Sequence, residues 1–242
     1  MTVNLWSSTF LLPNQGGILN INDLSYEQII ELVQDTKTDS VVLEQIAQWP
    51  LLNNENMHIV VSEETLLIEI AKHKNTSQET LEFLAKTFTI YAIDDFILNL
   101  LNNPKSSPLV LDQLVLQGED SECFEEVKSA VAGHPNASSE ILFFLSFDED
   151  WNIEGNATDN ANYEPIDDES LMSLANSEYE EIRYLVAINE ETPVEVLRKL
   201  STDFDFIRRA CAENPNCDQA LLEIFLKDED EYVREAAENQ LN

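Results

Sequence analysis

The sequence predicts an all-α fold, a solenoid of two-helix repeats that are each about 25 to 31 residues long. The first observation is that residues 182–200, IRYLVAINEETPVEVLRKL, and residues 207–225, IRRACAENPNCDQALLEIF, share one pattern of apolar, basic and Asn positions. The second is that this pattern recurs along most of the chain. The third is that only 5 of 242 residues are Gly, which disfavours a β-sandwich or barrel because those folds need many tight turns.

Each copy of the pattern begins with an apolar residue that we call its opener. The openers are Leu66, Phe96, Val127, Ile153, Ile182, Ile207 and Val233, which lie 25 to 31 residues apart. Apolar residues follow 15 and 18 positions later, as Leu81 and Leu84 follow Leu66, and a weaker first copy places Leu43 and Ile46 there. Fixed spacing within units and variable length between them is typical of a stacked array, in which each unit buries its apolar face against a neighbour.

Each unit is interpreted as two helices. The first ends at an Asn or His seven residues after the opener, such as Asn189, because Asn tolerates the left-handed conformation that closes a helix. The second begins at a cap such as Thr192, followed by Pro193, and carries the two late apolar columns on one face. Since a 25-residue unit is short for two full helices, we expect one of them to be a turn or two with 3₁₀ character.

The units cover most of the chain in this interpretation. We expect about seven to eight of them over residues 28–242, after an atypical N-terminal cap over 1–27. A longer loop is expected to interrupt the stack near 155–167, where the spacing of one copy is extended.

A third copy, VKSAVAGHPNASSEILFFL at 127–145, joins the two quoted above in its likeness to a known family. The three segments resemble the leucine-rich repeat variant family. The resemblance is strong across residues 66–242 and weaker across residues 28–65. The resemblance implies a right-handed superhelix of alternating α and 3₁₀ helices, but no activity, because repeat scaffolds host many functions. The founding member of the family holds an N-terminal iron–sulfur cluster with clustered Cys. This chain has no Cys before Cys123, so no cofactor is expected.

The charge of the chain is its outlying property. It has 13 Lys and Arg against 47 Asp and Glu, a net charge of −34, and residues 119–242 hold 32 of the acids. This balance disfavours direct binding to nucleic acid or to anionic lipid. Three Cys without a CxxC pair suit a reducing compartment, the first residues lack a basic signal-peptide start, and no apolar run could span a bilayer. We therefore expect a cytoplasmic protein with no membrane partner.

One segment is similar to the start of a calcium loop. Asp150, Asn152 and Glu154 alternate before Gly155, as oxygen ligands do at the start of an EF-hand. Ala161, however, occupies the twelfth position, where a bidentate Glu belongs. We therefore expect an acidic segment between helices and no metal site.

The other reactive side chains favour structural roles. His73 and His134 fall in the column that Asn occupies elsewhere, which indicates capping rather than proton transfer. Cys211 lies beside the Ala column, so we expect it to be a buried small side chain, with a redox pair to Cys217 as the alternative. The chain has no catalytic triad order, phosphate-binding Gly loop or HExxH motif, so we expect no catalytic residues and no enzyme.

A basic residue follows the opener directly in four copies. These residues are Lys128, Arg183, Arg208 and Arg234. Because equivalent positions align in a solenoid, we expect them to form a structural ladder that pairs with carboxylates of adjacent units. The alternative is a phosphate-binding stripe, which the surrounding negative charge disfavours.

The remaining acids are candidates for partner binding. The candidate residues are Asp148, Glu149, Asp150, Asp203, Asp205, Asp228, Glu229, Asp230 and Glu231. The first hypothesis is a non-enzymatic module that binds a basic protein. Its specific form is an inhibitor or immunity protein that occludes a nucleic-acid-binding cleft. The alternative is a neutral repeat scaffold that binds through its concave groove, with acidity that serves solubility only. The pattern specifies no oligomeric state.

Overall fold

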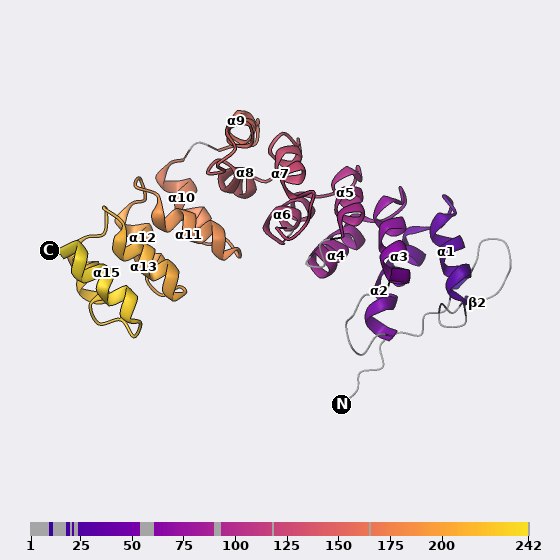
Figure 1. The fold of residues 1–242 in the computed structure, drawn as a ribbon, viewed down its shortest axis with the longest axis horizontal. Helices are drawn as coiled ribbons and strands as arrows, with labels where there is room; N and C mark the ends of the chain where they lie inside the picture. The colour runs from indigo at the N-terminus through magenta and orange to yellow at the C-terminus, as the bar shows by residue number, and fades with distance from the viewer. Residues whose placement is uncertain are drawn as a thin grey trace. The chain divides into compact units, whose positions relative to one another are not determined.

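The computed structural model describes residues 10–11, 18–19, 21, 24–53, 61–89, 93–117, 119–164 and 166–241. These residues are helical apart from one pair of two-residue strands and the connecting turns (Figure 1). The prediction of an all-α fold is therefore confirmed.

The strands lie within the expected N-terminal cap. Strand β1 (Phe10–Leu11) pairs antiparallel with β2 (Ile18–Leu19). Most of the cap segment 1–27, including Gly16, lies outside the described residues. The first helix begins at Tyr26, two residues before the expected start of the array.

The chain divides into two compact units, which are described separately. The first, Met1–Ala137, contains α1 (Tyr26–Gln34), α2 (Ser40–Asn53), α3 (Val61–Lys72), α4 (Gln78–Phe88), α5 (Asp94–Asn102), α6 (Pro108–Gln117) and α7 (Phe124–Ala132). The second, Ser138–Asn242, contains α8 (Ser139–Leu145), α9 (Trp151–Asp159), α10 (Asp168–Leu174), α11 (Glu180–Ile188), α12 (Val194–Leu200), α13 (Asp205–Glu213), α14 (Gln219–Phe225) and α15 (Glu231–Leu241). The sequence did not predict this division.

In both units a helix packs against the helix two further along the chain. In the first unit α3 packs against α1 and α5, and α4 packs against α2 and α6. In the second unit α13 packs against α11 and α15, while α12 and α14 pack against α13 from the other layer (Figure 1). The helices α11, α13 and α15 therefore form one layer, which we call the first-helix layer of the second unit.

The predicted apolar columns form the cores. All seven openers from Leu66 to Val233 are buried. The late columns are buried too, for example Leu197 with Leu200 and Leu222 with Phe225. Removing such a side chain from water contributes about 1.5–3 kcal/mol, so these columns supply most of what holds consecutive helices together.

The short second helices are α-helices, contrary to the expected 3₁₀ character. Helix α14 has seven residues, and its backbone bonds include Leu222 N–H to Asp218 O and Leu226 N–H to Leu222 O, both with α spacing. Its buried residues are Leu221, Leu222 and Phe225, which share one face at 3.6 residues per turn. The sequence interpretation used only the two columns three apart, and the third buried residue favours α. Within the described residues, 3₁₀ geometry is confined to Ile21 and Thr89.

The second helices begin one residue later than expected at the Thr positions. The N-cap of α12 is Pro193, and the hydroxyl of Thr192 instead donates to Val186 O at 2.6 Å. Likewise Ser77 caps α4, while Thr76 donates to Ile70 O at 2.7 Å. These Thr side chains are fully buried, and their hydroxyls satisfy an open carbonyl at the end of the preceding helix.

The Asn that ends each first helix is extended rather than left-handed. Asn189 has φ −65° and ψ 123°, and Asn214 has φ −68° and ψ 132°. The Oδ1 of Asn214 accepts the N–H of Asn216 at 2.9 Å, and its Nδ2 donates to Ala187 O and Asn189 O, both at 2.8 Å. Because one side chain closes its own turn and reaches the previous one, the residue has no need of a positive φ.

The same column has this role in the first unit. Asn103 donates to Ala71 O at 2.7 Å, and the Nε2 of His73 lies 3.1 Å from Asp35 O. His73 and His134 each accept a backbone N–H two residues on through Nδ1. His58, the third His, lies outside the described residues.

The insertion expected near 155–167 is shorter than predicted. Helix α9 continues to Asp159, so only residues after it form the connection to α10, which begins at Asp168. Ile153 and Ala157 lie one turn apart on α9 and are both buried. Their burial favours continuation of the helix into the segment where a loop was expected.

Candidate interaction surface

Arg183 links two consecutive helix pairs of the second unit. Its Nε and Nη2 donate to Asp203 at 2.7 and 3.0 Å, and its Nη1 donates to Ser177 O at 2.9 Å. Partial burial acts to raise the pKa of Asp203, but hydrogen bonds from Arg183 and from the Phe204 N–H outweigh it, and the pKa lies below its ordinary value. A planar guanidinium fits such a two-oxygen acceptor, which fixes both side chains.

Arg208 makes the equivalent link one helix pair later. Its Nε and Nη2 donate to Asp228 at 2.8 and 2.7 Å, and its Nη1 donates to Asp203 O at 2.8 Å. The exposed side-chain fractions of the pair are 13% and 11%. Hydrogen bonds from Arg208 hold the pKa of Asp228 below its ordinary value. Arg234 ends the series with bonds to the carbonyls of Asp228 and Glu229.

The fourth basic residue of the predicted ladder makes contacts within its own helix. Lys128 belongs to the first unit and pairs with Glu125 of its own helix at 3.1 Å. Its Nζ also lies 5.1 Å from the ring centre of Phe124. Arg183, Arg208 and Arg234 thus make the links of the second unit, and Lys128 braces α7.

Two of the predicted partner-binding acids are therefore engaged inside the protein. Asp203 and Asp228 are the carboxylates of the bidentate pairs, and they are not free for a partner. The sequence interpretation grouped them with their exposed neighbours because it could not tell which acid in a run faces an arginine of the preceding helix pair.

Four further acids close turns at helix starts. Asp148 accepts the N–H of Asp150, and Asp150 caps α9 by accepting the N–H of Asn152 at 2.8 Å. Asp205 accepts the N–H of Phe206, and Asp230 accepts those of Tyr232 and Val233. The last three, Glu149, Glu229 and Glu231, are exposed.

The possible calcium loop is a helix. Asp150 is the N-cap of α9, and Asn152, Glu154 and Gly155 lie within its first turns. Oxygen atoms on a helix point outward in different directions and cannot wrap one cation as an EF-hand loop does. Across the described part of the chain, no three His, Cys, Asp or Glu side chains gather as metal ligands.

Exposed aromatic side chains lie beside these acids, and the sequence analysis missed them. We call the four residues Tyr184, Phe204, Phe206 and Tyr232 the aromatic face; their exposed fractions are 38%, 52%, 40% and 64%. The ring centres of Tyr184 and Phe206 are 5.9 Å apart, and those of Phe204 and Phe206 are 6.1 Å apart and stacked. The signal was FDFIRR at 204–209, where two Phe flank an acid before an opener.

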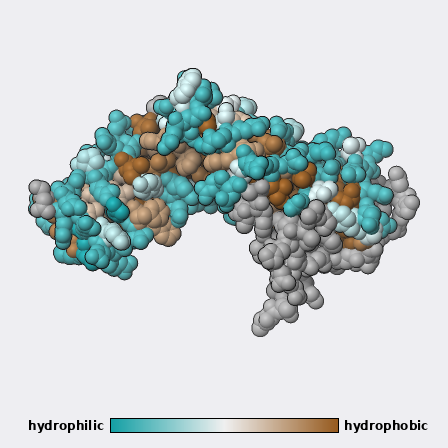
Figure 2. Space-filling model, in the orientation of Figure 1, coloured by the Kyte–Doolittle hydropathy of each residue, from teal (hydrophilic) through white to brown (hydrophobic). Residues whose placement is uncertain are grey.

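The aromatic face belongs to the first-helix layer. Tyr184 is on α11, Phe206 on α13 and Tyr232 on α15. Phe206 and Tyr232 each directly precede an opener, so they hold equivalent positions on two helices that pack together. Acids occupy the first turn of all three helices, namely Glu180, Glu181, Asp205 and Glu231. Figure 2 shows apolar patches set in a largely hydrophilic surface.

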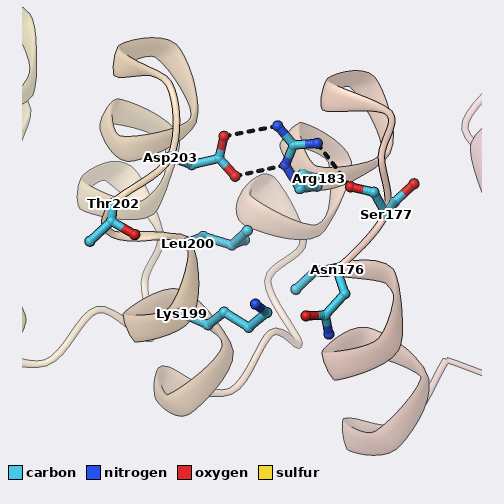
Figure 3. Close-up of a pocket in the computed structure, with 8 residues that line it drawn as sticks. Asn176, Ser177, Arg183, Lys199, Leu200, Thr202 and Asp203 are labelled. Carbon is cyan, nitrogen blue, oxygen red and sulfur yellow. Dashed lines mark hydrogen bonds and ion pairs between the residues drawn. The ribbon is translucent and has the colours of Figure 1, made fainter.

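An open pocket of about 370 Å³ lies beside the Arg183–Asp203 pair (Figure 3). Its walls come from the turn after α10, with Asn176 and Ser177, and from the end of α12, with Lys199 and Thr202. The guanidinium of Arg183 is hydrogen-bonded directly to Asp203, and Arg183 also reaches the Ser177 carbonyl. Because the pair is mutually saturated, the pocket offers polar contacts without a poised acid and base.

The cysteines of the second unit are buried thiols. Cys211 and Cys217 are free and buried, which agrees with the structural role expected for Cys211. Burial raises the pKa of Cys217 to about 11 and raises that of Cys211 further. Since the thiolate is the reactive form, both are poor nucleophiles.

Comparison of the chain with protein-family models, with curated proteins and with solved structures finds no match. The resemblance to the leucine-rich repeat variant family therefore stays a prediction. In the described residues, no helix is long and apolar enough to cross a membrane.

Proposed function

We propose that this chain is a non-enzymatic protein-binding module whose second unit engages a positively charged protein. The observation that carries the proposal is the aromatic face, which lies among the acidic first turns of α11, α13 and α15. Clustered exposed aromatics are costly to leave in water and are typical of protein interfaces, where Tyr and other large rings dominate the binding energy.

The charge of the second unit supports a basic partner. Residues 138–242 hold 27 Asp and Glu against 7 Lys and Arg. Arg183, Arg198 and Arg208 are paired with carboxylates of the chain, so the exposed surface is dominated by acids. Such a field accelerates association with a cationic partner, and the acceleration falls as salt screens it.

The same proposal includes the shape of the scaffold. We infer a right-handed solenoid of repeats similar to the leucine-rich repeat variant family. It is supported by packing on the helix two further along from α1 to α7 and in the series α11, α13 and α15, and by the repeated Arg–Asp pairs with a separation of 20 residues. Solenoids present extended surfaces to partners, because equivalent positions of successive repeats align.

The finer form of the proposal is inhibition by occlusion. A basic cleft that normally receives nucleic acid would accept the exposed carboxylates of Glu229 and Glu231 in place of phosphates, with the aromatic face against its walls. The alternative, a neutral scaffold that binds through another groove, predicts that neither the acids nor the rings matter.

Affinity capture from the source lysate after nuclease treatment, at low and moderate salt, tests the proposal. We expect a stoichiometric basic protein that is released as the salt concentration rises. The double variant Glu229→Lys/Glu231→Lys should capture less of it, and it keeps the Asp228 carboxylate that accepts from Arg208, unlike reversal of the whole 228–231 run, although it removes the 4.0 Å contact of Glu229 with that arginine. A neutral partner that is insensitive to salt and to the double variant would favour the scaffold alternative.

A further inference from the structure

We propose that the aromatic face recognises arginine in preference to lysine, so that the partner of the second unit contributes an arginine-rich segment. This inference rests on the proposed function and deepens it. Each guanidinium would lie against an exposed ring and pair with the carboxylate next to that ring.

The chain itself already holds one guanidinium in this way. The guanidinium carbon of Arg183 lies 5.8 Å from the ring centre of Phe204, while Asp203 accepts the hydrogen bonds from its Nε and Nη2. Ring and carboxylate are neighbours in sequence, and the Phe204 N–H donates to the same carboxylate at 2.8 Å. An acid followed by an aromatic residue is thus a unit that binds a guanidinium here.

The same unit occurs twice more on the outer surface of this layer. Asp205 precedes Phe206 on α13, and Glu231 precedes Tyr232 on α15. The Phe206 N–H donates to Oδ1 of Asp205 at 2.9 Å, which fixes that carboxylate at the start of α13, and the Tyr232 N–H donates to Oδ1 of Asp230 at 2.9 Å, which fixes a carboxylate at the start of α15. Both rings are exposed, at 40% and 64%, so each could receive a guanidinium from outside.

The spacing of the two units defines the partner further. Helices that pack directly, as α13 and α15 do, have axes about 8–10 Å apart. A polyproline-like segment rises about 3.1 Å per residue with three residues per turn, so arginines three positions apart share a face and are about 9 Å apart. An extended segment of the form Arg-x-x-Arg therefore matches Phe206 and Tyr232.

The preference for arginine follows from the chemistry of the two cations. A guanidinium is planar and weakly hydrated, so it can stack on a ring and bind a carboxylate at the same time. An ammonium is compact and strongly hydrated, and it loses more hydration at an exposed ring. A second copy of the chain is a poor occupant, because the net charge of −34 on each copy makes them repel.

Two matched peptides, (Arg-Gly-Ser)₄ and (Lys-Gly-Ser)₄, test the inference on the full chain. Each carries a fluorescent label, and binding is followed by anisotropy at low and moderate salt. We expect the arginine peptide to bind about tenfold tighter than the lysine peptide, as two cation–π contacts would give. The variants Phe206→Leu and Tyr232→Leu keep apolar bulk and remove the ring, so each should reduce the ratio.

The matched control is Ile224→Ala, which changes an exposed apolar residue on α14 outside the aromatic face. It should leave the ratio unchanged. Equal binding of both peptides, with salt dependence, would overturn the arginine inference and leave the proposed function in place. Binding of neither peptide by a folded chain would count against both, and lysate capture would then decide the proposed function alone.

Discussion

The two units share one way of packing helices but link consecutive pairs differently. All five arginines of the chain lie in the second unit, and its links include the bidentate Arg183–Asp203 and Arg208–Asp228 pairs. The links described in the first unit are hydrogen bonds without arginine: side-chain to backbone bonds such as Asn103 to Ala71 O and Asn75 to Thr38 O, and side-chain to side-chain bonds such as Ser107 to Glu82 and Ser121 to Asp94. One packing scheme therefore tolerates two kinds of connection.

The surfaces of the two units also differ, in their exposed apolar side chains and in their acids. Among the described residues, Val41 is the exposed large apolar side chain of the first unit, whereas the second has nine, including the aromatic face. The second unit also holds 27 of the 47 acids. Internal use of arginine holds the repeats together and leaves the outer surface acidic and aromatic, which suits a binding surface.

The largest effect expected is on the Arg208 link. Arg208→Leu leaves Asp228 nearly buried without its cation, so we expect the second unit to lose about 2 kcal/mol of stability. Urea denaturation, with hydrogen exchange to separate the units, measures it. Arg209→Leu removes the neighbouring exposed pair with Glu213 and should change nothing measurable. Equal effects of the two variants would contradict the role given to the bidentate pairs.

Variants of the column of Asn residues that end the first helices should show that this Asn-to-carbonyl link stabilises both units. Asn214→Ala and Asn103→Ala each leave buried backbone groups without partners, at a cost of about 1–2 kcal/mol. We expect Asn214→Ala to cost slightly more, because Asn214 donates to two carbonyls. Segment-resolved hydrogen exchange should place each loss in its own unit. A loss in one unit only would mean that the column is not equivalent in both.

Low pH should remove the stability that the Arg208–Asp228 pair contributes. The pKa of Asp228 is lowered on folding, so its carboxylate adds stability above its ordinary pKa of 3.8, and this is lost as the pH falls through the folded value. The stability gap between the unaltered chain and Asp228→Asn should be constant near neutral pH and shrink below about 4. Denaturation at a series of pH values measures the gap, and a gap that widened in acid would reverse the assignment.

The smallest stability effect is expected on the aromatic face. Tyr232→Ala removes the most exposed of these rings and should change the free energy of unfolding by less than about 0.5 kcal/mol, whereas Phe206→Ala also removes the ring contacts with Tyr184 and Phe204 and should cost about 1 kcal/mol. Thermal unfolding checks this. A larger loss would mean that the rings serve the fold rather than a partner.

The core was predictable and the surface was not. The openers and late columns are apolar at fixed spacing, and burial follows from that pattern, as for Ile207 and Phe225. Which acid pairs with Arg208 depends on the turn that brings Asp228 within reach, 20 residues later, and the apolar spacing alone does not single out this acid among its neighbours, although the same separation joins Arg183 to Asp203. The apolar spacing does not show the aromatic face, because Phe206 and Tyr232 directly precede openers and the pattern does not tell an exposed ring from a buried one.

The most direct test of the account is capture of the partner by the unaltered chain, by Phe206→Ala/Tyr232→Ala and by Ile224→Ala, followed by mass spectrometry. We expect a stoichiometric basic protein that is lost with the double variant and retained with Ile224→Ala. Retention of the same protein by the double variant, or a stoichiometric partner that is neutral or acidic, would contradict it.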